Sequence, residues 1–238
     1  MSNGILLSMS RYSYKRSYDW DCSLAYIAGV IASDGCLLKD GRHINITSVD
    51  IELLEQAKNI LSLNCDIGKK KNGYGGYGYY IQFSNVALYD FLQRSGITPA
   101  KSKTILRVVL PDLYYADFLR GLFDGDGCIY GFWDKRWRSS LMYYTEFASA
   151  SMGFLEWVHR KNNELAGVNG GRIKPGTRAA SLSYAKADSQ KLFGFMYYQQ
   201  GLPTLSRKRM KFVDFIRSDP YANKELLGRV AKLVDAPA

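Results

Sequence analysis

The sequence has few of the residues that build metal clusters and disulfide frameworks. Its 238 residues include only four cysteines and two histidines. Cys22, Cys36, Cys65 and Cys128 lack the paired C-x-x-C spacing of zinc sites, so we expect reduced thiols. The histidines have no partner at ligand-like spacing. We therefore expect neither a zinc site nor a histidine-based nuclease.

Long hydrophobic runs are also missing. The longest, Leu24 to Ala32, is far too short to span a bilayer. After Ile5-Leu6-Leu7 the N-terminus becomes polar and basic, unlike a signal peptide. These features predict an intracellular protein, in the cytoplasm or an organelle, with no membrane partner.

Acidic residues are outnumbered. The chain has 32 Lys and Arg against 22 Asp and Glu, a formal net charge of +10, together with 18 Tyr and 4 Trp. This balance favours a polyanionic partner, above all nucleic acid. The chain is 47% hydrophobic, which is enough for one large domain or two small ones with a core.

One element occurs twice. Leu24 to Cys36 and Ala116 to Cys128 each contain an apolar helical pattern with an internal glycine, followed directly by Asp-Gly-Cys. A single Asp-Gly after an amphipathic helix is usually only a helix stop. Two copies at matching positions, ending in Asp34 and Asp126, instead favour a functional role for the carboxylates and a chain built from two similar halves.

The physical chemistry of this element predicts a metal site. Gly29 and Gly121 would let two helix backbones approach closely, while Gly35 and Gly127 would end the helices with a positive φ. Each aspartate would then lie at a helix C-terminus, where the macrodipole disfavours negative charge. If the helices pack in parallel, the carboxylates also repel each other. A divalent cation at the helix–helix seam would offset both penalties.

The two copies, Ile27-Ala-Gly-Val-Ile-Ala-Ser-Asp-Gly35 and Leu119-Arg-Gly-Leu-Phe-Asp-Gly-Asp-Gly127, resemble the LAGLIDADG motif of homing endonucleases. The resemblance extends over roughly Asp21 to Arg217. It implies an α+β fold of two pseudo-symmetric αββαββα repeats, with antiparallel β-sheets forming a DNA-binding saddle and the motif helices at the repeat interface.

The expected organisation has five parts. Residues 1–20 are an N-terminal extension, 21–98 the first repeat, 99–115 a linker, 116–217 the second repeat and 218–238 a C-terminal tail. The periodicity of each half reads helix–strand–strand–helix–strand–strand–helix. A final helix, Ser206 to Arg217, closes the second repeat.

The resemblance implies a monomeric, intron-encoded, site-specific endonuclease that makes a double-strand break at a long asymmetric DNA target. In the family the last acidic residue of each motif binds metal, which assigns Asp34 and Asp126 to Mg²⁺, with Mn²⁺ or Ca²⁺ as substitutes. Which backbone oxygen near Ser33 joins them is left open. Asp124, whose counterpart is Ala32, is expected to be a structural or solvated carboxylate.

Basic residues near the scissile phosphates are also expected. Lys101, Lys103 and Lys208 follow the strands and helix of each repeat and are candidates for stabilising charge during cleavage. Strand alternation places polar residues on one sheet face for base contacts, and basic turns would meet phosphates. The predicted DNA contacts are Lys39, Arg42, His43, Asn45, Thr47, Lys69, Lys70, Lys71, Tyr80, Gln82, Lys135, Arg136, Arg138, Tyr143, Thr145, Arg172, Lys174, Arg178, Ser181 and Ser183.

Two other functions fit the same fold. One is an intron RNA maturase, and the other is a DNA-binding regulator that no longer cleaves. Both aspartates are present, which argues against the regulator, because a pure binder gains nothing from clustered carboxylates beside DNA phosphates.

Overall fold

The structure, a computed structural model, describes residues 18–71, 75–136, 141–222 and 224–234. The first half contains α1 (Cys22–Asp34), β1 (Gly35–Leu37), β2 (His43–Ser48), α2 (Ile51–Leu61), β3 (Gly68–Lys71), β4 (Tyr77–Ser84) and α3 (Val86–Arg94). Short 3₁₀ turns, η1 (Lys101–Lys103) and η2 (Asp112–Tyr114), follow in the connection. The second half contains α4 (Tyr115–Asp126), β5 (Gly127–Trp133), β6 (Leu141–Ser149), α5 (Met152–Leu165), β7 (Arg172–Lys174), β8 (Ala180–Tyr184), α6 (Lys186–Met196), α7 (Ser206–Ser218) and α8 (Lys224–Val234). The predicted contact Arg138 lies outside the described residues.

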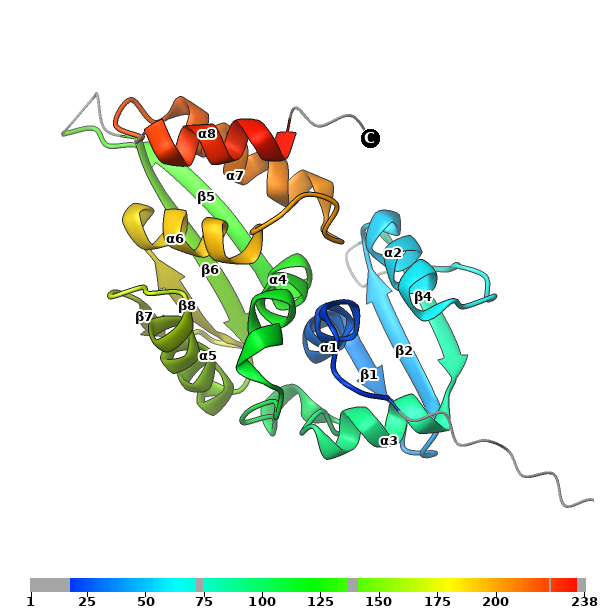
Figure 1. Cartoon of the computed structure of the whole chain (residues 1–238). Coiled ribbons are helices and arrows are strands. Elements are labelled where there is room, and N and C mark those ends of the chain that lie inside the picture. The colour runs from blue at the N-terminus through cyan, green and yellow to red at the C-terminus, as the bar shows by residue number, and fades with distance from the viewer. Residues whose placement is uncertain (1–17, 72–74, 137–140, 223, 235–238) are drawn as a thin grey trace, which may run out of the picture.

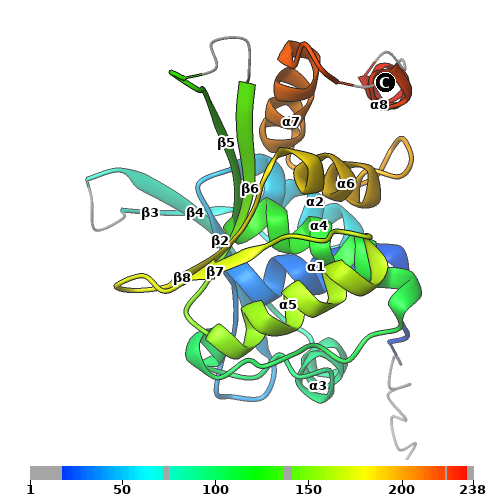
Figure 2. The ribbon, with the colours of Figure 1, turned by 90° about the vertical axis from the view of Figure 1, so that its left-hand side faces the viewer.

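Each half forms its own antiparallel, four-stranded sheet. The strand orders are β1-β2-β4-β3 and β5-β6-β8-β7, the same arrangement twice, as the repeat predicted. In Figure 1 the helices α1 and α4 lie side by side between the two sheets. Figure 2 shows the helices gathered on one side of the molecule, with β3, β5 and β8 extending away from them. One face of each sheet is therefore covered by helices, and we call the other its open face.

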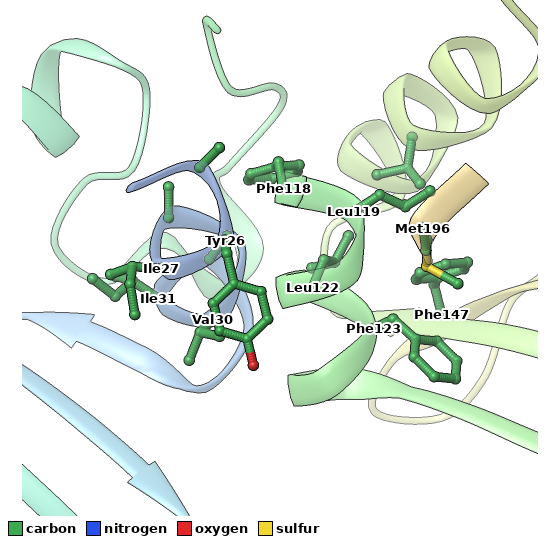
Figure 3. Packing of buried hydrophobic residues seen from close by; sticks show 14 of the residues in the cluster. Tyr26, Ile27, Val30, Ile31, Phe118, Leu119, Leu122, Phe123, Phe147 and Met196 are labelled. Atoms are coloured by element: carbon green, nitrogen blue, oxygen red, sulfur yellow. The ribbon is translucent and has the colours of Figure 1, made fainter. Parts of the chain in front are cut away.

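The apolar core lies between the motif helices and the two covered faces. Ile44 and Ile46 of β2 are fully buried, and Phe147 of β6 is 1% exposed. In Figure 3, Ile27 and Ile31 point from α1 toward the first sheet, whereas Phe123 points from α4 toward Phe147. The alternation of buried and exposed residues along β2 thus sets which side chains reach the open face.

The seam between α1 and α4 depends on direct backbone contact. A Cβ added at Gly29 would lie 2.1 Å from the Phe118 carbonyl oxygen, and one at Gly121 would lie 2.0 Å from that of Tyr26. No side chain fits at either position. The two glycines therefore do what the sequence predicted, and the motif helices pack as one unit (Figure 3).

The glycines after the helices have a different role from the one predicted. Gly35 has φ −95° and Gly127 has φ −85°, so the expected positive φ is wrong. Each helix passes straight into a strand, which brings the turn close to the preceding helical turn. A Cβ at Gly35 would lie 2.6 Å from Ile31 Cα, and one at Gly127 2.6 Å from the Phe123 carbonyl oxygen. Space, not dihedral freedom, requires glycine at both positions.

The faces predicted for β6 are also corrected. Tyr143 and Thr145, expected to contact DNA, are fully buried on the covered face. The Tyr143 ring stacks on Phe215 with centroids 5.5 Å apart, and its hydroxyl accepts a 2.7 Å hydrogen bond from Gln190. Both residues share this face with Phe147, so Tyr144 occupies the open face instead. Among the described helices, none has the length and hydropathy needed to cross a membrane.

Candidate functional site

Asp34 and Asp126 are the last residues of α1 and α4. The helices run in the same direction, because Gly29 packs on Gly121 near their middles and Ser33 on Gly125 near their ends. A Cβ at Gly125 would also lie 3.4 Å from the Asp34 carboxylate. The seam therefore brings both carboxylates to one end, where each chain enters the first strand of its sheet.

The negative charge of Asp126 opposes the ionisation of Asp34. Burial, and then the negative charge of Asp126, raise the pKa of Asp34 to about 7. Burial also raises the pKa of Asp126, although this side chain keeps an exposed side. Lys208 and Lys101 oppose the rise at both aspartates. Two acids with raised pKa values at one seam are typical of functional sites.

Two lysines are buried at the helix ends. The Lys208 ammonium donates to the carbonyl oxygens of Phe123, Asp124 and Gly125 at 2.8, 2.8 and 2.7 Å. Lys101 donates to the Gly35 carbonyl oxygen at 2.6 Å. The Asp124 and Gly125 carbonyls belong to the last turn of α4, whose carbonyls have no amide of a following turn to accept from, and a cation at this end also favours the helix dipole. Lys103 is exposed and makes no comparable contact, so the structure brings only Lys101 and Lys208 to the aspartates.

The comparisons with known proteins agree with this architecture. Residues 21–97 match the family model of the LAGLIDADG-like domain. The homing endonuclease I-WcaI bound to its DNA recognition sequence has a TM-score of 0.57 at 14% identity, over 80% of this chain and 85% of that one. I-GzeII in complex with its DNA target has a TM-score of 0.56 at 12% identity, over 90% and 98%. The chain therefore has the LAGLIDADG fold.

The fold also occurs in DUF199/WhiA. The N-terminal LAGLIDADG domain of DUF199/WhiA has a TM-score of 0.53 at 16% identity, over 78% of this chain and 85% of that one. No curated protein matches the sequence. At these identities the solved structures show the LAGLIDADG fold and nothing finer, so the activity of the chain must be argued from its own residues.

Asp124, in the last turn of α4, is structural, and the solvated alternative is wrong. It is 2% exposed and accepts hydrogen bonds from the Tyr26 hydroxyl at 2.9 Å and the Leu205 amide at 2.8 Å. Burial raises its pKa to about 6. Leu205 immediately precedes α7, so Asp124 links both motif helices to the start of the helix that carries Lys208.

No pattern in the sequence indicates the contacts that hold α7 against the first half of the chain. Arg207 donates to both carboxylate oxygens of Asp50 at 2.7 and 2.6 Å, and the Ser206 amide donates to Glu52 at 3.0 Å. In the other direction, the Ser151 hydroxyl donates to the Ile105 carbonyl oxygen at 2.5 Å. Each repeat's closing segment thus docks on the other repeat, and this fixes where the two lysines lie.

The open faces of the LAGLIDADG sheets begin at the aspartates. On the first sheet Asn45 lies opposite Gln82 and Thr47 opposite Tyr80, and Lys70 donates to Thr47 at 3.2 Å. Lys69 and Lys71 pair with Tyr79 and Tyr77 and so lie on the opposite face from Asn45 and Thr47, where Lys69 packs over the Tyr77 ring at 3.9 Å. His43 contacts Asp40, and Arg136 pairs with Asp134 at 3.0 Å.

The remaining predicted DNA contacts divide by exposure. On the second sheet Arg172 lies opposite Ser183 and Lys174 opposite Ser181, but Ser183 is only 8% exposed. The exposed members are Lys39, Arg42, Lys71, Lys135, Arg172, Lys174 and Arg178.

Two hollows flank the seam. One, of about 290 Å³, is lined by Asp34 and Gly125 together with Lys70 and Arg207. The other, of about 180 Å³, is lined by Asp126 and by small residues that include Ser33 and Ser102. Each aspartate therefore has its own recess at the edge of an open face.

Proposed function

We propose that this LAGLIDADG protein is an intron-encoded, site-specific endonuclease that makes a Mg²⁺-dependent double-strand break at a long asymmetric DNA target. One observation carries the proposal. Asp34 and Asp126, from different repeats, meet at one end of the seam, and the charge of one raises the pKa of the other. Two neighbouring carboxylates are electrostatically unfavourable unless a bound cation compensates their charge.

The donor set fits a magnesium ion. Ionised carboxylate oxygens are the ligands that Mg²⁺ prefers, and it usually takes one or two carboxylates beside substrate phosphates. Among the described residues no group of three or more His, Cys, Asp and Glu side chains could hold a metal. Asp34 and Asp126 would therefore hold the ion with backbone and phosphate oxygens as the other ligands.

The chain's own residues have distinct parts in hydrolysis. A divalent cation, when bound, polarises the phosphate and lowers the pKa of the attacking water. Lys101 and Lys208 place fixed positive charge beside the aspartates, where the phosphate gains negative charge as it reacts. Their hydrogen bonds to helix-end carbonyls hold them in position, so no reorganisation is needed during the reaction.

The open faces account for a DNA substrate. Asn45, Gln82 and Lys70 are side chains that pair with base edges in the major groove, and the exposed Lys and Arg residues suit phosphates. The two sheets carry different residues on their open faces. A single chain with two unlike sheets would read a long site without symmetry, as a monomer.

The decisive experiment replaces each aspartate by its isosteric amide. Asp34→Asn and Asp126→Asn should each lower double-strand cleavage in Mg²⁺ by at least about a thousandfold, because a metal ligand is lost. DNA binding should persist, since neither change removes a cation. The target is first selected from a randomised duplex library, and gel assays then measure nicking and binding separately. Asp90→Asn, in α3, is the matched control and should cut normally.

The same assay separates the other two functions. Full cleavage by Asp34→Asn and Asp126→Asn would remove the proposed centre. A wild-type protein that binds a selected duplex without nicking it in Mg²⁺ would be a regulator. Stimulated splicing of an intron RNA, without DNA cleavage, would make it a maturase. The mutual repulsion of Asp34 and Asp126 favours the nuclease, because a protein that only binds phosphates would be improved by losing it.

A further inference from the structure

The open faces of the two sheets have different chemistry. The residues of the first face are polar, with Asn45, Thr47 and Gln82 in register on β2 and β4. The corresponding region of the second face is mainly aromatic, with one carboxylate at its inner end, where Glu146 accepts a 3.4 Å hydrogen bond from the Tyr130 hydroxyl. Tyr130 lies opposite Tyr144, and Phe132 lies opposite Met142. We call Tyr130, Tyr144 and Phe132 the aromatic row.

The aromatic row is ordered by mutual stacking. Tyr130 and Tyr144 have ring centroids 5.6 Å apart with an interplanar angle of 21°, and Phe132 and Tyr144 are 6.2 Å apart at 20°. Phe132 is 52% exposed and Tyr130 is 38% exposed. The row is not an unused part of the core, because the residues that alternate with it, Ile129 and Tyr143, are buried on the covered face.

This stacking limits what can bind. The faces of neighbouring rings are turned toward each other, so a base from a single strand would have to separate them before it could stack. The ring edges and the Phe132 side chain remain available for apolar contact. In the major groove of a duplex, the one apolar group that the bases present is the C5-methyl group of thymine.

Thymine is favoured over the other bases for a second reason. Cytosine lacks the methyl group, and the major-groove edges of adenine and guanine carry only donors and acceptors, for which an apolar ring offers no partner. A polar group that loses water without gaining a partner costs free energy. Phe132 should therefore reject these edges as well as attract a methyl group.

The position of the row identifies duplex DNA as the occupant. β5 begins at Gly127, directly after Asp126, so the row extends outward from the proposed cleavage centre. Arg172 and Lys174, exposed on β7 of the same sheet, supply positive charge for the phosphates beside it. An apolar surface for a protein partner would have no reason to share a face with these cations in a chain of net charge +10.

We propose, on the basis of the proposed function, that the aromatic row reads thymine methyl groups and makes the half-site facing the second sheet thymine-rich. The other half-site is read by hydrogen bonds. There Asn45 and Gln82 suit adenine and Lys70 suits guanine. The two halves of the target thus differ in the kind of contact as well as in sequence.

The experiment uses deoxyuridine, which lacks only the methyl group. The target is selected from a randomised duplex library with the full-length protein, and thymines in each half-site are then replaced by deoxyuridine. Dissociation constants are measured in Ca²⁺. Each replacement at the row should weaken binding roughly fourfold, the effect of exposing one methyl-sized group. Replacements in the other half-site should change binding less than about twofold, within the scatter of such small effects.

Two variants assign the effect to the row. Phe132→Ser should abolish the difference between thymine and deoxyuridine, whereas Trp133→Ser should preserve it. Trp133 is the matched control, because it is the next residue of β5, is 51% exposed and alternates to the other face. A selected target without thymine enrichment in either half-site, or equal affinity for both forms of DNA, would overturn the assignment. If the protein cleaves its target but binds the thymine and deoxyuridine forms equally, the role of the aromatic row is refuted and the nuclease function is not. If the protein binds no duplex at all, the nuclease function is refuted as well.

Discussion

Asp34, a proposed metal ligand, is in an environment that disfavours its charge in the free protein. Its carboxylate sits at a helix C-terminus, partly buried and facing the charge of Asp126. Both the helix dipole and the second carboxylate oppose ionisation. The folded protein therefore binds a proton at Asp34 more tightly than the unfolded chain does.

Asp34→Asn should consequently stabilise the protein when no divalent cation is present. The pKa of Asp34 is about 7 in the folded state, against about 3.9 in an unfolded chain. The contribution of Asp34 to the free energy of unfolding of the wild type is therefore present at low pH and is lost as the pH rises through 7. The variant should melt higher than wild type at about pH 8 and no higher near pH 4. Thermal unfolding in EDTA measures this, with Asp90→Asn as control. An equal gain at both pH values would contradict the linkage.

Lys101 and Lys103 form a natural matched pair. They lie in the same 3₁₀ turn, but Lys101 is 4% exposed and donates to Gly35, whereas Lys103 is in solvent. Lys101→Met should lower the cleavage rate by about a hundredfold while DNA affinity changes little, because it removes fixed charge beside the reacting phosphate. Lys103→Met should cut at nearly the wild-type rate. Single-turnover cleavage, checked against thermal unfolding, gives the comparison, and equal losses would exclude the assignment.

The sequence could identify the aspartates but not the lysines. Asp34 and Asp126 stand out because a whole motif is repeated around them. Lys103 and Lys208 lie equally far after Gly96 and Gly201, so spacing alone favours the wrong residue of the first repeat. Ala100 has a left-handed φ of 56°, and the turn that follows buries Lys101 instead. No periodic pattern of apolar and polar residues predicts such a turn.

At the scale of elements, the α1–α4 seam holds the two halves together through backbone contact. Gly29→Ala should destabilise the protein by about 3 kcal/mol or more, because its Cβ would meet the Phe118 carbonyl oxygen and force the helices apart. Gly228→Ala is the control. Its Cβ would meet nothing within 4 Å in α8, so it should stabilise by about 0.5–1 kcal/mol through helix propensity. Urea denaturation measures the free energy of unfolding of both variants. An unchanged free energy of unfolding for Gly29→Ala would contradict the close backbone contact between α1 and α4.

Strands were predictable where the pattern of apolar and polar residues is unambiguous. In β2 the isoleucines alternate with His43, Asn45 and Thr47, and the structure has that alternation. In β6 every position from Met142 to Thr145 tolerates either face, because tyrosine and threonine suit both a core and a wet surface. Pairing with β5 decides the matter by placing Tyr144 beside Tyr130 on the open face. Register of this kind is set by tertiary contacts, which a single strand does not encode.

At the scale of the molecule, the repeat predicted the architecture but not the way the halves are joined. The ion pair between Arg207 and Asp50 connects residues far apart in sequence. It depends on where α7 begins relative to α2. Pseudo-symmetry places these segments near each other, and local chemistry then makes the two docking contacts different, ionic at α2 and hydroxyl-to-carbonyl at α5.

The whole-molecule charge gives the last prediction, on the salt dependence of DNA binding. A surface with net charge +10 and exposed cations around two open faces should release counterions from the phosphates that it contacts. With roughly six to ten such contacts, affinity should fall by about 10³–10⁵ between about 50 and 200 mM salt. Lys39 is an exposed cation that we propose contacts a phosphate, so Lys39→Met should reduce the logarithmic slope by about one. Phe132→Ser should leave the slope unchanged and alter only the choice of bases. Fluorescence anisotropy titrations at several salt concentrations separate the two effects, and a salt-independent affinity would mean that the open faces do not bind the duplex backbone.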